Sequence, residues 1–64
     1  MIIILKDNKK QLFNVFLRGI MIGAIYPSNA GYSIVINKTE IGCFLTLDIA
    51  ENEVHNYINK KADS

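Results

Sequence analysis

Cys43 and His55 are the single thiol and the single imidazole of the chain, so they are the first candidates for catalytic chemistry. A cysteine nucleophile needs a base beside it, and a histidine base in a hydrolase needs a third group to orient its ring. Cys43 falls in an expected strand and His55 inside an expected helix, and their spacing does not pair them. We therefore expect a half-buried cysteine, a histidine at the rim of the core and no enzymatic activity.

Three carboxylates, Asp48, Glu51 and Glu53, could be considered as an acid–base set. Such chemistry requires two groups in different environments, one of them partly desolvated. These residues instead occupy the start of an expected helix, where capping and the helix dipole account for acidic side chains. Neither the Cys/His/acid spacing of a closed metal site nor a glycine-rich phosphate loop is present. We expect no catalytic residue, no metal and no cofactor.

Short runs rich in β-branched and aromatic residues alternate with turn residues along most of the chain. Each run has the length and composition of a strand, and the run at 20–25 is apolar on both faces, which is typical of a central strand. The sequence thus predicts up to five strands, at residues 2–5, 13–17, 20–25, 32–36 and 41–45.

Residues 8–20 also fit a second interpretation, an amphipathic helix capped by Asp7 or Asn8. The Phe, Val and Ile content favours a strand, and the helical alternative stays open. The apolar positions that would form the helical stripe are Leu12, Phe13, Phe16, Leu17, Ile20 and Met21.

The carboxyl-terminal segment predicts a helix that begins near Thr46 or Asp48, either of which can cap the free amides of the first turn. Together these elements predict an α+β fold in a single domain, residues 1–64. The fold is an antiparallel β-meander of three to five strands with one C-terminal helix packed on one face. The apolar stripe of the helix consists of Leu47, Ala50, Val54, Tyr57 and Ile58.

The chain has 64 residues, and 50% of them are hydrophobic. A domain this small buries only about 60% of the surface of its unfolded chain, and neither a disulfide nor a metal cluster is available to stabilise it. We therefore expect self-association, as a homodimer, or binding to another protein. Residues 2–5 should form an edge strand that is paired within the chain or with another chain. The candidate interaction residues are Ile2, Ile4, Phe16, Arg18, Met21, Tyr26 and Tyr32.

The formal net charge is only +1, but residues 1–39 carry five basic side chains against one acidic one. This division predicts a basic end and an acidic end. It also supports an alternative hypothesis, a small nucleic-acid-binding regulator that uses the basic half, although typical binders have a larger basic excess. The residues that would contact nucleic acid are Lys6, Lys9, Lys10, Arg18 and Lys38.

No targeting signal is recognisable at residues 1–10, because the apolar run is short and is followed by charged residues. The apolar stretch at 12–26 contains Asn14 and Arg18 and falls short of a membrane-spanning helix, so the Gly19-x-x-x-Gly23 pair does not indicate a membrane dimer. We expect a cytoplasmic protein without a membrane partner.

Residues 15–25, 31–36 and 42–50 contain the elements G-x-x-x-G-x-I, G-Y and F-x-T-L-x-x-A. In this order they resemble small uncharacterised proteins of phages and prophages, in which a strand meander leads into a helix. The resemblance covers about two thirds of the chain and supplies no site residues. It implies a phage-encoded accessory protein that engages or inhibits a host factor, with anti-restriction and anti-CRISPR roles among the possibilities.

Overall fold

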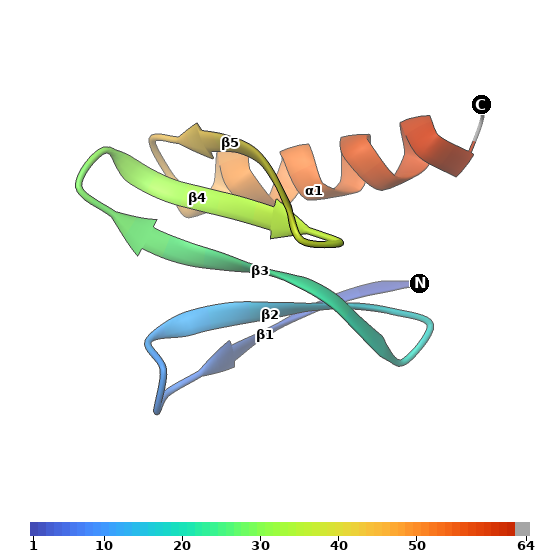
Figure 1. The fold of residues 1–64 in the computed structure, drawn as a ribbon, viewed down its shortest axis with the longest axis horizontal. Coiled ribbons are helices and arrows are strands. Elements are labelled where there is room, and N and C mark those ends of the chain that lie inside the picture. The colour runs from blue at the N-terminus through green and yellow to red at the C-terminus, as the bar shows by residue number, and fades with distance from the viewer. Residues whose placement is uncertain (63–64) are drawn as a thin grey trace.

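The computed structural model describes residues 1–62, which form one antiparallel sheet and one helix (Figure 1). The strands follow one another across the sheet in the order β1-β2-β3-β4-β5, so the topology is a simple meander. The predicted α+β fold with a C-terminal helix is confirmed. The elements are β1 Ile2–Asp7, β2 Leu12–Leu17, β3 Ile20–Ser28, β4 Gly31–Ile36, β5 Thr39–Phe44 and α1 Leu47–Ala62.

Strand β2 settles the ambiguity at residues 8–20. It pairs with β1 on one side and with β3 on the other, and Val15 in its middle is fully buried. The helical alternative is wrong. Pairing with β1 and β3 satisfies the backbone N–H and C=O groups of β2, and alternation of its side chains between the two faces buries Val15 while Asn14 and Phe16 stay half-buried.

Two of the four connections between strands are two-residue turns in which both residues have positive φ. These residues are Arg18 and Gly19, with φ of 53° and 82°, and Asn37 and Lys38, with φ of 52° and 67°. Paired positive φ values define a turn whose twist matches that of the flanking strands. The turns therefore present Arg18 and Lys38 at the tips of two hairpins.

The connection between β1 and β2 is longer and is held by a side chain. One carboxylate oxygen of Asp7 accepts hydrogen bonds from the backbone N–H groups of Lys9 and Lys10, at 3.0 and 3.2 Å. Asp is favoured at the start of turns because its short side chain can accept from amides two or three residues ahead. This turn presents Lys9 and Lys10 to solvent.

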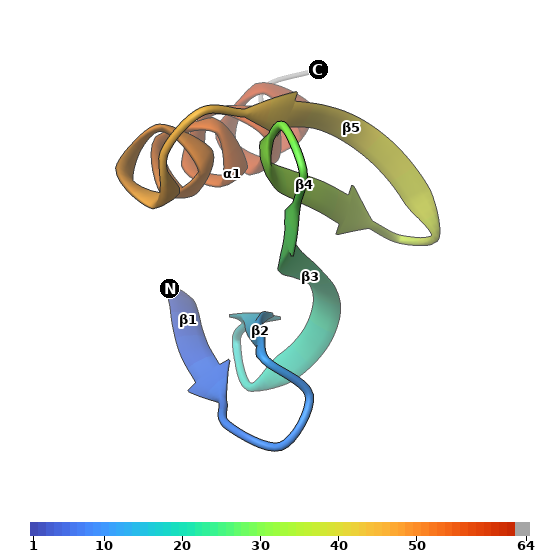
Figure 2. The same ribbon diagram turned by 90° about the vertical axis from the view of Figure 1, so that its left-hand side faces the viewer.

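The sheet is strongly curved. In Figure 2 the strands follow an arc from β5 to β1, and α1 lies on the inner side of this arc. Register shifts occur between Val15 and Phe16 in the pairing with β3, and between Ile34 and Val35 in the pairing with β5. The extra residues at these bulges are Ile22 and Ile41, and bulges increase the local bend and twist of a strand. We call the two sides of the curved sheet the concave face, which carries α1, and the convex face.

The core lies between the concave face and α1, which packs mainly against β4 and β5. Ile2 and Ile4 at one end of the sheet and Phe44 at the other pack at its margin. Its fully buried residues are Val15, Ile25, Ile34 and Ile36 from the sheet and Ala50 and Val54 from the helix.

Helix α1 begins directly after Thr46, which is one of the two capping residues predicted from the sequence. The hydroxyl of Thr46 accepts a hydrogen bond from the backbone N–H of Ile49 at 3.2 Å, and its carbonyl accepts one from Ala50 at 3.0 Å. Thr46 is therefore the N-cap, and Asp48 lies in the first turn, where the helix dipole favours an acid. The predicted apolar stripe is confirmed, since its members are buried or pack against the core.

Within residues 1–62, α1 is too short and too polar to cross a membrane.

Candidate protein-interaction surface

The convex face of the sheet carries apolar side chains although no helix covers it (Figure 2). Cross-strand register shows how they are arranged, because residues directly opposite one another on neighbouring strands point to the same face. Ile3 lies opposite Phe16, and Phe16 lies opposite Met21, so these three side chains form one apolar row across β1, β2 and β3.

A second row lies beside the first. Leu5 is opposite Asn14, Asn14 is opposite Ala24, and Ala24 is opposite Val35. The row ends at the exposed Glu40 on β5, which is opposite Val35. Asn14 lies between the apolar Leu5 and Ala24 and offers an amide for hydrogen bonding. We call the two rows together the convex patch: Ile3, Phe16, Met21, Leu5, Asn14, Ala24 and Val35.

The convex patch includes three of the exposed large apolar side chains. Ile3 is 41% exposed, Leu5 55% and Met21 60%. An open hollow of about 430 Å³ adjoins Met21, Ala24 and Val35, and Lys38 lies at its rim. A contiguous apolar surface with a hollow and a polar rim has the features of a protein contact site.

The predicted interaction residues separate onto the two faces of the sheet. Phe16 and Met21 lie opposite each other in the convex patch, and Tyr26 lies farther along β3 on the same face, opposite Ser33. Arg18 occupies the turn between β2 and β3.

The remaining three predicted interaction residues point to the concave side. Ile2, Ile4 and Tyr32 pack at the margin of the core, so the structure does not bring them together with Phe16 and Met21. The exposed apolar side chains of β1 are instead Ile3 and Leu5, which were not among the predicted interaction residues. Residues 2–5 are all apolar, and therefore alternation could not show which of them face solvent.

The five basic residues of the nucleic-acid hypothesis do not form one surface. Lys9 and Lys10 lie in the turn at one end of the sheet, whereas Arg18 and Lys38 lie in turns at the opposite end (Figure 1). Lys6 lies on β1, the edge strand.

The predicted division into a basic end and an acidic end is also not reproduced in space. Lys60 and Lys61, which belong to the acidic half of the sequence, lie in the last turn of α1. This turn is at the same end of the molecule as the turns that carry Arg18 and Lys38 (Figure 1). An antiparallel meander returns each strand to the opposite end, and so charge runs in the sequence are distributed between both ends.

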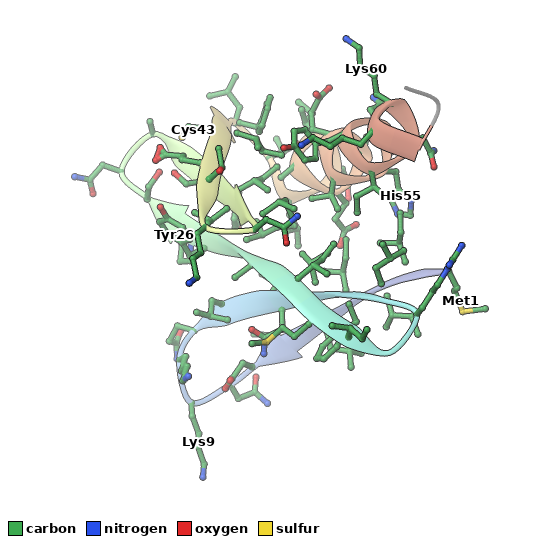
Figure 3. The ribbon with its side chains drawn as sticks, turned by 45° about the vertical axis from the view of Figure 1, so that its right-hand side comes forward. Met1, Lys9, Tyr26, Cys43, His55 and Lys60 are labelled. Atoms are coloured by element: carbon green, nitrogen blue, oxygen red, sulfur yellow. The ribbon has the colours of Figure 1, made fainter. Side chains whose placement is uncertain are left out.

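Cys43 and His55 are not brought together. Cys43 lies on β5 opposite Ser33, on the convex face, and its Sγ atom is 3.4 Å from Ser28 Oγ. His55 is exposed on α1, which packs on the concave face, and Figure 3 shows the two side chains in separate parts of the molecule. The sheet therefore separates the thiol from the imidazole, and this arrangement offers no nucleophile–base pair.

The acidic side chains likewise show no catalytic grouping. Asp48 lies in the first turn of α1, and no cluster of three or more His, Cys, Asp or Glu side chains that could hold a metal ion occurs in residues 1–62. A cleft of about 280 Å³ between α1 and the sheet is lined mostly by apolar side chains, with Lys61 above the ring of Tyr57 at 5.5 Å. Among residues 1–62, no acid, histidine or cysteine lines this cleft.

Comparison with known proteins identifies no relative of this chain. No protein-family model, curated protein or solved structure matches the chain.

Proposed function

We propose that this protein is a non-enzymatic protein-binding module that uses the convex patch to contact another protein. The observation that carries the proposal is the exposure of Ile3, Leu5 and Met21 on one uncovered face of a very small domain. Exposing this much contiguous apolar surface is unfavourable for a free monomer, while burying it against a partner contributes about 25 cal/mol for each Å² removed from water.

The composition of the patch supports the same proposal. Phe16 and Met21 are of the residue types that are enriched at protein interfaces, and the flexible thioether of Met21 can adapt to the shape of a partner. Asn14 can supply a directional hydrogen bond within the apolar surface. Together with the resemblance to small phage proteins, this points to a phage-encoded modulator that acts in the bacterial cytoplasm by occupying a surface of a host protein.

A capture experiment tests the proposal. The tagged protein is used as bait in bacterial lysate with and without nuclease, in parallel with Met21→Glu and with the control Asn52→Glu. Both substitutions place a carboxylate at an exposed position, but Asn52 lies on α1, away from the convex face.

We expect one host protein to be retained by the original chain and by Asn52→Glu after nuclease treatment, with recovery reduced at least about tenfold for Met21→Glu, which corresponds to about 1.4 kcal/mol. The retained protein is then purified and the comparison repeated with the two components alone. Equal retention by Met21→Glu would contradict the proposal. Recovery that disappears with nuclease would instead favour the nucleic-acid hypothesis.

A further inference from the structure

The free edge of β1 presents unpaired backbone groups in a definite order. The backbone N–H of Arg18 donates to the carbonyl of Met1 at 3.1 Å, so Met1 and Arg18 form a hydrogen-bonded pair of the antiparallel ladder. Hydrogen-bonded and non-hydrogen-bonded pairs alternate along such a ladder. The N–H and C=O groups of Ile2, Ile4 and Lys6 therefore point away from β2, toward the open edge.

The opposite edge of the sheet, β5, is protected, and β1 is not. β5 contains a bulge and lies against α1. β1 has no bulge, no proline and no helix packed closely on it, and its one basic residue is Lys6. Native proteins ordinarily block a regular apolar edge of this kind, because it is a template for pairing with another strand.

We propose that the edge of β1 pairs with β1 of a second copy of this chain, in antiparallel orientation about a twofold axis that passes through Ile4. This inference goes beyond the proposed function, because its occupant is a second copy of this chain that pairs through the backbone edge of β1. Ile3 and Leu5 of the convex patch lie beside that edge. The two five-stranded sheets then continue as one sheet of ten strands.

The register follows from which backbone groups are free. A hydrogen-bonded pair across the axis must join two residues from the set Ile2, Ile4 and Lys6. Centring the axis on Ile4 uses all three, because Ile4 pairs with its own copy and Ile2 pairs with Lys6 of the second copy, in both directions. Centring it on Ile3 or Leu5 leaves one residue of each strand unpaired, so fewer hydrogen bonds form.

The side chains agree with this register. On the convex face Ile3 lies opposite Leu5 of the second copy, so two exposed apolar side chains from each chain become neighbours. Lys6 lies opposite Ile2, and its aliphatic stem can cover that side chain. The Lys6 residues of the two copies are four residues apart along the paired strands, or about 14 Å at about 3.4 Å per residue. This is beyond the screening length of about 10 Å at 0.1 M salt, so their repulsion is small.

The first test measures amide hydrogen exchange of the unmodified protein by NMR, at concentrations above and below the self-association range found by sedimentation. We expect the N–H groups of Ile2, Ile4 and Lys6 to exchange at least about tenfold more slowly at the high concentration, because they become hydrogen-bonded only in the dimer. The amides of Ile3 and Leu5, which already bond to β2, serve as the internal control. Unprotected Ile4 and Lys6 amides at high concentration, or a monomer throughout, would overturn the inference.

The second test checks the register with two double variants. In Ile3→Glu/Leu5→Glu the carboxylates face each other across the axis, whereas in Ile3→Lys/Leu5→Glu an ammonium faces a carboxylate at both contacts. Both variants lose the same two apolar side chains and differ only in the sign of the charge at position 3.

We expect the first double variant to sediment as a monomer and the second to dimerise at least about tenfold more tightly than the first at low salt. Circular dichroism verifies that each variant is folded. If either variant is unfolded, the hydrogen-exchange measurement on the unmodified chain tests whether the β1 edges pair. Equal association of the two variants would overturn the proposed register, whether both are monomers or both are dimers. The double variants also alter the convex patch, but the readout is self-association of the purified protein, so failure of this inference is distinguished from failure to capture a host protein.

Discussion

The two halves of the sheet differ in how completely they are covered. β4 contributes the fully buried Ile34 and Ile36 to the core, and α1 lies over β4 and β5. β1 has no buried residue, and two of its apolar side chains, Ile3 and Leu5, face solvent. The helix-covered half can thus account for stability, and the uncovered half carries the surfaces available for binding.

The comparison also shows how one short helix is used. With 16 residues, α1 covers only part of a five-stranded sheet. Exposed apolar side chains nevertheless lie on the convex face of the uncovered strands, at Ile3 and Leu5 of β1 and Met21 of β3. This exposed apolar surface on a small domain is the basis of the proposed contact with another protein.

The largest expected effect is on the covered half. Ile34→Ala should lower the free energy of unfolding by about 2–5 kcal/mol, because it removes a fully buried side chain between the sheet and the helix. Met21→Ala, on the uncovered side, should lower it by less than about 1 kcal/mol. Urea denaturation at equal protein concentration measures both, and comparable losses for the two variants would break the comparison.

A smaller effect is expected at the start of the helix. Thr46→Ala should destabilise the fold by about 1 kcal/mol, because it removes the acceptor for the backbone N–H of Ile49. Thr46→Ser keeps the hydroxyl and is the control, and its stability should stay close to that of the original chain. Thermal unfolding compares the two, and an unchanged Thr46→Ala would show that the cap contributes nothing to the covered half.

A similar or slightly smaller loss is expected at the turn of the uncovered half. Asp7→Ala should cost about 0.5–1.5 kcal/mol, because it removes the acceptor of the hydrogen bonds from the Lys9 and Lys10 amides. Asp7→Asn retains a side-chain oxygen and should lose less. The same denaturation measurement applies, and equal stability of all three chains would mean that the turn does not hold β1 in place.

The smallest effect is expected for the basic turn. Lys9→Glu/Lys10→Glu should change the affinity for a captured host protein by less than about twofold, or about 0.4 kcal/mol, because this turn lies outside the convex patch. Titration of the purified components measures it. A large loss that deepens at low salt would favour a contact through the basic residues instead.

Much of the fold follows from local sequence patterns. Short runs of β-branched and aromatic residues predicted the strands, and the apolar stripe from Leu47 to Ile58 predicted the helix. The structure contains the strands and the helix. The ambiguity at residues 8–20 had a physical origin, since Phe13, Val15 and Leu17 fit a period of two while Phe13, Phe16 and Leu17 fit a period of 3.6. Pairing with β1 and β3, which is nonlocal, resolved it.

The candidate surface was only partly predictable. Phe16 and Met21 were selected by residue type, but their adjacency depends on the bulge that inserts Ile22 between the registers of β2 and β3. Ile3 and Leu5 were missed because an all-apolar run does not show its exposed face. The scattering of the basic residues could not be predicted without the meander, since the two turns that bound strand β2 lie at opposite ends of the sheet.

The most direct test of the central claim, that the convex patch is a contact surface for another protein, is photo-crosslinking in living bacteria. A photoreactive phenylalanine analogue is introduced at Met21 and, in a separate chain, at Asn52 on the exposed side of α1. The account predicts a discrete adduct with another protein from position 21 and none from position 52. Adducts from position 52 alone, or equal adducts from both positions, would contradict it.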